Sequence, residues 1–70
     1  PNILSDMSER DIMKMIGELP EGYKHVFNMY AVEGYSHKEI ADKLEISEST
    51  SKTQYRKAKL RLQKLIQENE

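Results

Sequence analysis

The sequence predicts an all-α fold, a four-helix domain that contains a helix-turn-helix. Three observations carry this prediction: apolar residues recur at spacings of three and four, helix-capping signals separate these runs, and no stretch shows the strict alternation of a half-buried strand. The chain has 70 residues and shows no internal repeat. We therefore expect a single domain over 1–70, built around one small core.

The first helix is expected at about 8–18. Ser8, with Asp11 three residues later, resembles a capping box, in which a serine side chain accepts a hydrogen bond from the first turn of the helix. The apolar residues of this run recur at helical spacing: Ile12, Met15, Ile16 and Leu19. Residues 1–7 precede the capping signal, and we expect them to be the remnant of a flexible linker.

The second helix is expected at about 20–33. Pro20 suits the first helical position, because its fixed φ is helical and its missing N–H is not needed there. Its apolar residues again lie three and four positions apart: Tyr23, Val26, Phe27 and Tyr30. Gly34 can adopt the positive φ that ends a helix, so the helix should stop just before it.

Two closely spaced helices complete the domain, at about 36–44 and 48–67. Ser36 and Glu39 form a capping box for the first, and Ser47 is the expected N-cap of the second. Two helices joined by a turn of three or four residues are the helix-turn-helix arrangement. The last helix should be roughly 30 Å long at 1.5 Å per residue.

Charge is distributed unevenly along the chain, although the formal net charge is only −1. Residues 1–51 carry five basic and ten acidic side chains, whereas residues 52–70 carry six basic and two acidic ones. A segregated basic stretch of this kind indicates an anionic partner for one end of the molecule. A helix face that is merely solvated would have the same composition.

The last helix has an apolar side and a side of hydroxyls and cations, when it is wound at about 100° per residue. The side that must face the core contains Ser51, Tyr55, Ala58, Leu62, Leu65 and Ile66. The opposite side and its flanks contain Ser49, Lys52, Thr53, Arg56, Lys57, Lys59, Arg61 and Lys64. Short hydroxyls come first and cations follow, which suits a helix that enters a major groove about 12 Å wide by its N-terminus. Lys64 lies far enough along to be carried past the groove.

Nearly the whole chain, from about Ser8 to Ile66, resembles region 4 of sigma-70-type RNA polymerase sigma factors, particularly the extracytoplasmic-function group and its Bacteroidetes relatives. The residues that carry the resemblance are LPEGYKHVFNMYAVEGYSHKEIADKLEISESTSKTQYRKAKLRL. The most specific parts are LP, EGYSHKEIA and the serine-rich start of the basic helix. The resemblance implies that the last helix recognises the −35 element of promoter DNA and that the domain docks on the β-flap of RNA polymerase. An anti-sigma factor is a further partner of this kind of domain.

The resemblance and the helical winding together assign candidate site residues. The expected DNA-binding residues lie at and after the turn: Ser47, Ser49, Thr50, Lys52, Thr53, Arg56, Lys57 and Lys59. His37 and Lys38 are candidate phosphate contacts, although a solvated ring in the first helical turn is the simpler expectation for His37. Met15 is expected in the core, whereas Met13, Met29 and Val32 are candidate polymerase-binding residues.

Two positions depart from the pattern of the family. Glu45 stands where many helix-turn-helix turns have Gly, so a left-handed backbone there would be strained by about 1 kcal/mol. Ser51 stands where an aliphatic residue is common, which removes a core contact and should leave the helix pair less tightly fixed. The promoter-melting region of the family has no counterpart in this chain, so we expect a fragment or an isolated domain.

Several other classes of function find no support in the sequence. Without cysteine the chain has no thiolate metal site, and it is compatible with the reducing cytoplasm. His25 and His37 have no ligand at helical spacing beside them, so we expect no metal and no other cofactor. No nucleophile motif, Gly-rich phosphate loop or paired catalytic carboxylates appear, so an enzyme is not expected. No apolar run approaches the roughly 20 residues that span a bilayer.

Two alternative functions remain open. One is the output domain of a response regulator of the quorum-sensing type, which is also a four-helix helix-turn-helix domain and dimerises through its last helix. The other is a protein-interaction module whose basic helix binds an acidic partner instead of DNA.

Overall fold

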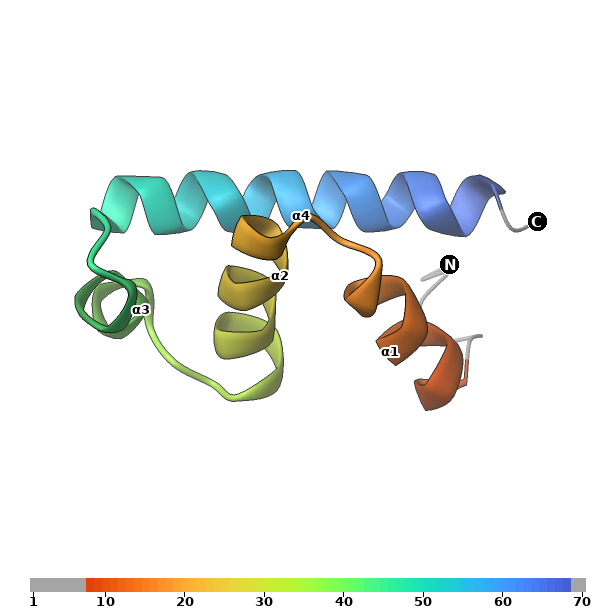
Figure 1. The fold of residues 1–70 in the computed structure, drawn as a ribbon, viewed down its shortest axis with the longest axis horizontal. Coiled ribbons are helices and arrows are strands. Elements are labelled where there is room, and N and C mark those ends of the chain that lie inside the picture. Colours follow the sequence, from red (N-terminus) through yellow and green to blue (C-terminus); the bar gives the residue numbers. More distant parts are fainter. Residues whose placement is uncertain (1–7, 69–70) are drawn as a thin grey trace.

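The computed structural model describes residues 8–68 of the chain. In chain order its elements are α1 (Glu9–Gly17), α2 (Glu21–Phe27), the π-helical segment η2 (Asn28–Val32), α3 (His37–Leu44) and α4 (Glu48–Glu68). The long helix α4 runs the length of the molecule, and the shorter helices lie along one side of it (Figure 1). In that view α3 lies at the N-terminal end of α4 and α1 near its C-terminal end. The all-α prediction and its helix-turn-helix are confirmed.

The predicted N-terminal caps are present at three helices. The backbone N–H of Asp11 donates to Ser8 Oγ at 3.2 Å at the start of α1. At α3 the capping box is complete, because Glu39 N–H donates to Ser36 Oγ at 3.1 Å and Ser36 N–H donates to Glu39 Oε1 at 3.0 Å. Ser47 caps α4 through the backbone N–H of Thr50. These bonds satisfy donors that a helix start otherwise leaves unpaired.

Pro20 lies one position earlier in its helix than predicted. Its ψ of 147° is extended, so it is the N-cap and α2 begins at Glu21. An N-cap residue still takes part in the helix through its carbonyl, and that of Pro20 accepts from Lys24 N–H at 2.9 Å. The prediction of Pro20 at the first helical position is therefore wrong by one residue.

The second predicted helix is not uniform, because its last turns widen into η2. The N–H of Glu33 donates to the carbonyl of Asn28, five residues back, at 2.9 Å. The N–H of Tyr35 then donates to the carbonyl of Met29, also at 2.9 Å, and Gly34 makes this reversal with a φ of +82°. The predicted stop at Gly34 is confirmed. The periodicity of the sequence did not reveal this π-helical turn, because a single i→i+5 turn is too short to change the pattern of apolar spacing along the helix.

The core lies between α1, α2 and the C-terminal half of α4. Its buried residues are Met15, Ile16, Leu19, Ala58, Leu62 and Ile66. Met15 is buried as predicted, whereas Met13 is 47 % exposed. Towards α3 the most deeply buried side chains are Val26, Ile40 and Ser51. The predicted apolar side of α4 thus faces the other helices.

The turn of the helix-turn-helix passes through a left-handed residue. Glu45 has φ 58° and ψ 45°, a conformation that costs a residue with a Cβ about 1–2 kcal/mol. After it, the N–H of Ile46 donates to the carbonyl of Ala41 at 3.0 Å. Leu44 and Ile46 are only half-buried, because an apolar groove between the turn, α2 and α4 remains open beside them.

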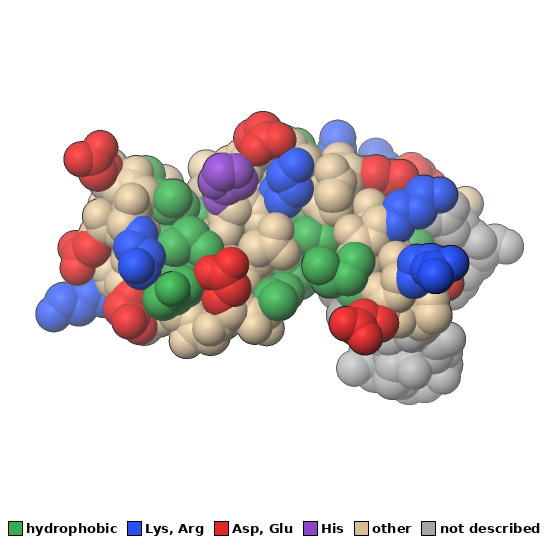
Figure 2. Space-filling view, turned by 60° about the horizontal axis from the view of Figure 1, so that its bottom comes forward, with side chains coloured by type: hydrophobic (Ala, Val, Ile, Leu, Met, Phe, Trp, Pro, Cys, Tyr) green, Lys and Arg blue, Asp and Glu red, His purple; other side chains and the backbone are tan. Residues whose placement is uncertain are grey.

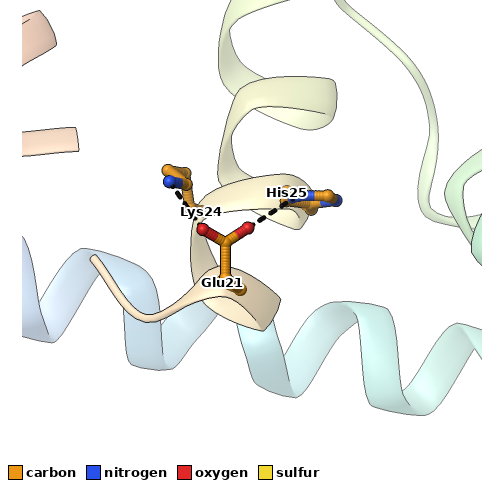
Figure 3. Close-up of polar contacts among 3 residues, drawn as sticks. All are labelled: Glu21, Lys24 and His25. Atoms are coloured by element: carbon orange, nitrogen blue, oxygen red, sulfur yellow. Dashed lines mark hydrogen bonds and ion pairs between the residues drawn. The ribbon is translucent and has the colours of Figure 1, made fainter. Parts of the chain in front are cut away.

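The first turn of α2 carries the ion pairs of the described residues. Glu21 bonds Lys24 Nζ at 2.9 Å and His25 Nε2 at 3.0 Å with its two carboxylate oxygens (Figure 3). The Lys24 ammonium, and after it the His25 ring, hold the pKa of Glu21 below its ordinary value. Both contacts lie on the surface and join residues of one helix, so they stabilise α2 locally.

Candidate DNA-binding interface

Hydroxyl groups fix the N-terminus of α4. Ser47 Oγ accepts from the backbone N–H of Thr50 at 2.9 Å, and its own O–H donates to Thr50 Oγ1 at 2.8 Å. Both residues are exposed, and so is Ser49. The solvent-facing start of α4 therefore presents three short polar side chains, which leave room for another molecule to approach the helix closely.

Cations follow these hydroxyls along the exposed side of α4. Arg56 and Lys57 are exposed, whereas Thr53 is half-buried. Lys52 is exposed on one flank. The order predicted from the helical winding, with hydroxyls first and guanidinium and ammonium groups after them, is the order along the folded helix.

Lys59 lies on the same flank and contacts an aromatic ring of its own helix. Its Nζ is 4.9 Å from the centroid of the Tyr55 ring, within the range of a cation–π interaction. Lys59 is nevertheless an exposed residue. This contact gives Lys59 a preferred position beside the N-terminal half of α4.

The cations of α4 have no acidic partner within residues 8–68. In this part of the chain Glu21 is the acid of both ion pairs, and its partners belong to α2. Fixed positive charges that are not neutralised internally create a surface potential that attracts an anion. The basic side of α4 is thus available to a partner.

Leu60 is a surface residue that the sequence reasoning missed. It is 59 % exposed and lies in a shallow hollow that Tyr23, Lys57, Arg61 and Lys64 also line. Helical winding alone places position 60 on the outward side of α4, so the sequence contains the signal, although an apolar residue there does not resemble a DNA contact. The basic surface therefore includes an apolar spot.

A polar contact ties the start of α3 to α4. His37 Nδ1 lies 2.8 Å from Ser51 Oγ, and Ser51 is fully buried. His37 is half-buried, so the expectation of a solvated ring is wrong. The aliphatic contact expected to be lost at Ser51 is replaced by this hydrogen bond, which joins the two helices of the helix-turn-helix directly.

Aromatic rings surround this contact. Tyr30, from η2, stacks on the His37 ring with the centroids 4.3 Å apart and the planes at 13°. Tyr55, from α4, lies 4.6 Å from Tyr30 and meets the His37 ring edge-on at 5.9 Å. Phe27, from α2, stacks on Tyr55 with the ring centroids 5.6 Å apart. These rings join α2, η2, α3 and α4, so they fix the orientation of α3 against the N-terminal half of α4.

The remaining candidate on α3 is Lys38, which is exposed in the first helical turn. Next to it, the backbone N–H of Ser36 donates to the Glu39 carboxylate. This bond, and after it the Ser36 side chain, holds the pKa of the Glu39 carboxyl below its ordinary value. The capping box satisfies the N–H groups of Ser36 and Glu39, so the donors that this turn can offer to an anion are the backbone N–H groups and the side chains of His37 and Lys38.

The candidate polymerase-binding residues differ in exposure. Val32 is 56 % exposed and Met13 is 47 % exposed, but Met29 is half-buried. Figure 2 shows a face on the side away from α4, where hydrophobic side chains emerge between charges of both signs. This face therefore differs in character from the hydroxyl and cation side of α4.

No group of three or more His, Asp or Glu side chains in residues 8–68 is arranged to hold a metal ion. Within the same residues, no helix has the length and apolar character needed to cross a membrane.

A comparison with known families gives one match. The family described as sigma-70, region 4 matches residues 9–62. Neither the curated proteins nor the solved structures yielded a match. The matched residues include α3, the turn and most of α4, so the family match and the candidate interface concern the same part of the chain. The match favours a sigma factor over the output domain of a response regulator.

Proposed function

Because the chain belongs to the sigma-70 region 4 family, a non-enzymatic family of DNA-binding domains of sigma factors, we propose that α4 recognises the −35 element of a promoter. The observation that carries this proposal is the exposed side of the N-terminal half of α4. It presents short hydroxyls and then Arg56 and Lys57, without an acidic partner in the described chain. The major groove admits a helix of this kind, and Arg or Lys can reach guanine acceptors there.

The candidate residues divide into two roles by their place on α4. We assign base contacts to Ser49, Thr53, Arg56 and Lys57, because they lie outward within the first turns of the helix. Lys52 and Lys59 lie on the flank, where the phosphates of a bound duplex would run. Ser47 and Thr50, which bond each other at the start of α4, are short enough to let a duplex approach this end of the helix closely.

The isolated domain should bind DNA weakly. One helix makes few phosphate contacts, and the chain as a whole carries a formal net charge of −1. We therefore expect a Kd in the micromolar range or weaker at physiological salt. Tight binding in a complete initiation complex would depend on RNA polymerase, which supplies the remaining contacts.

Selection of bound duplexes from a random pool tests the proposal directly. We expect enrichment of one short motif, read by a single helix, and loss of that preference in Arg56→Ala. A chain that enriches no motif, but binds an acidic protein more tightly than any duplex, would contradict promoter recognition and favour an interaction module.

We further propose that Met13, on α1, and Val32, on η2, contact the β-flap of RNA polymerase. Both side chains are about half exposed although the domain has few apolar residues to spare for its core. Exposed apolar groups on a small soluble domain often mark a protein interface. An anti-sigma factor that bound the same residues would compete with polymerase.

Charge substitution separates the two surfaces. Val32→Asp should weaken binding to an isolated β-flap fragment and leave duplex binding unchanged. Leu60→Asp is the matched control, because it places the same charge on an equally exposed apolar residue of α4 and should weaken duplex binding instead. If Val32→Asp leaves flap binding unchanged while circular dichroism shows a folded chain, this docking surface is wrong.

A further inference from the structure

If α4 binds DNA as the proposed function requires, the hydrogen bond between His37 of α3 and Ser51 of α4 also affects how the domain contacts the DNA backbone. We propose that Ser51 holds His37 in the tautomer that carries its ring proton on Nε2, and that this N–H donates to a phosphate of duplex DNA. His37 and Ser51 would then act as one backbone-contacting unit, in which Ser51 is the positioning residue.

The direction of the hydrogen bond follows from the burial of Ser51. Its side chain is fully buried, and His37 Nδ1 at 2.8 Å is its partner within the described residues. If Nδ1 were the donor, the Ser51 O–H would be buried without an acceptor, which costs more than an unused lone pair on the same oxygen. The hydroxyl therefore donates and Nδ1 accepts. An uncharged imidazole that accepts at Nδ1 carries its proton at Nε2.

The Nε2 atom reaches the solvent. Within residues 8–68, Gln54 Oε1 is the buried side-chain nitrogen or oxygen that lacks a partner. His37 Nε2 also makes no hydrogen bond in this part of the chain. Since it is not among the buried atoms without a partner, Nε2 is at least partly exposed to solvent. The donor is thus presented to whatever approaches the start of α3.

The ring is held in place on more than one side. Tyr30 stacks on its face at 4.3 Å, Tyr55 meets it edge-on, and Ser51 fixes the rotation of the ring. Ser51 lies in the first turns of α4 on its core-facing side, so the imidazole lies at the level of the turns proposed to enter the groove, behind their exposed side and next to α3. Phosphates line the edges of the groove, and Lys38 follows His37 on the same turn.

An uncharged donor and a lysine can be distinguished by the salt dependence of DNA binding. The salt dependence of DNA binding reports the number of phosphates neutralised by charge, because each neutralisation releases counterions. Loss of an uncharged donor should lower affinity without changing the salt slope. Loss of a cation should lower affinity and reduce the slope by about one unit.

Binding measurements on duplexes of mixed sequence, at alkaline pH, test the phosphate contact. His37→Phe keeps an aromatic ring for Tyr30 to stack on but removes both nitrogens, so it should weaken binding to all duplexes about five- to tenfold with an unchanged salt slope. His37→Gln places an amide nitrogen near the position of Nε2 and should recover part of this loss. Lys38→Ala removes a cation instead, so it should weaken binding and reduce the salt slope by about one unit.

Nitrogen NMR of the imidazole tests the tautomer independently of DNA. The wild-type chain should show the proton on Nε2, and addition of duplex should slow its exchange with water. Ser51→Ala should lose the fixed tautomer, and His37→Phe combined with Ser51→Ala should bind no more weakly than His37→Phe alone.

Each contrary result has a defined meaning. A proton on Nδ1 in the wild-type chain, or losses that add in the double variant, overturns the coupling to Ser51. If His37→Phe binds duplexes as tightly as the wild-type chain, or if its salt slope falls by about one unit, the uncharged phosphate contact is wrong. The coupling of His37 to Ser51 would still stand. Failure of the wild-type chain to bind any duplex overturns the proposed function and the phosphate contact with it.

Discussion

The two halves of α4 are held against the rest of the domain by different chemistry. In the C-terminal half, Leu62 and Ile66 pack with Ile16 in an aliphatic core. In the N-terminal half, the buried position facing α3 is Ser51, which bonds a histidine and lies beside Tyr55 in a cluster of rings. One continuous helix is thus anchored by aliphatic contacts at one end and by polar and aromatic contacts at the other.

The difference shows how a small domain separates stability from orientation. Aliphatic contacts are not directional, and they contribute free energy roughly in proportion to the area that they bury. Hydrogen bonds and stacked rings contribute less, but they work only in a narrow range of geometry. The end of α4 proposed to read DNA is therefore the end whose orientation is the better specified.

The largest expected effect is in the aliphatic anchor. Leu62→Ala should destabilise the domain by about 2–5 kcal/mol, because Leu62 is only 5 % exposed and its removal leaves a cavity. For a domain of this size that is comparable with the whole stability. Urea unfolding followed by circular dichroism measures it. Leu60→Ala, on the same helix but 59 % exposed, should change stability by no more than about 0.5 kcal/mol; equal losses at both positions would mean that the anchor has been misplaced.

The next effect concerns the exposed side of the other half. Arg56→Ala should cost about 1–3 kcal/mol of binding to the preferred duplex and relax discrimination at one base pair. Lys64→Ala should lower affinity little and leave sequence preference unchanged, because Lys64 lies two turns, or about 10 Å, further along. Titrations on preferred and scrambled duplexes compare them. A change of base preference in Lys64→Ala but not in Arg56→Ala would reverse the orientation of α4 on DNA.

A smaller, favourable effect is expected at the turn that leads into the N-terminal half. Glu45→Gly should stabilise the domain by up to about 1 kcal/mol, since Gly adopts the observed left-handed conformation without strain but loses more entropy on folding. Thermal unfolding provides the measurement. Glu45→Ala is the control that removes the side-chain charge and keeps the strain, and it should not stabilise. Equal gains from both would assign the effect to charge.

The smallest effect is a pH dependence at the start of α3. Bonds to Ser36 hold the pKa of Glu39 below its ordinary value of 4.5 in the folded chain. A lowered folded pKa means that this stabilisation is fully present above the ordinary pKa and is lost as the pH falls from there through the folded pKa. In Glu39→Gln the decline of the urea midpoint on acidification should be shallower than in the wild type.

The control for this pH dependence is Asp42→Asn, at an exposed carboxylate on the same helix outside the capping box. It should not flatten the acid decline as Glu39→Gln does. If the two variants behave alike, the lost stability comes from general charge and not from the cap.

Much of the architecture was predictable because it rests on local signals. The capping serines at Ser8, Ser36 and Ser47 and the reversal at Gly34 each act through bonds or backbone angles within a few residues, which the order of the chain specifies. The buried and exposed sides of α4 were also predictable, since a long helix repeats every 3.6 residues. Pro20 was misplaced by one residue because the preferences of proline at adjacent positions of a helix start are similar.

The residues of the candidate site could be named from the sequence, but their surroundings could not. The hydroxyls and cations of α4 follow from helical winding and from the family resemblance. Met29 was expected with Met13 and Val32 on the surface, yet it is half-buried within the π-helical segment η2. A change of helix type depends on packing against neighbouring elements, which periodicity does not report.

The sequence by itself determined four helices, the caps of three of them, the amphipathic side of α4 and the segregation of positive charge at one end. These features depend on residues close together in the chain or on one helical repeat. Only the tertiary structure decided that His37 bonds Ser51, fourteen residues away, under the ring of Tyr30. Such a contact requires three helical segments to meet at a particular angle and distance, and that geometry arises from the packing of the whole domain.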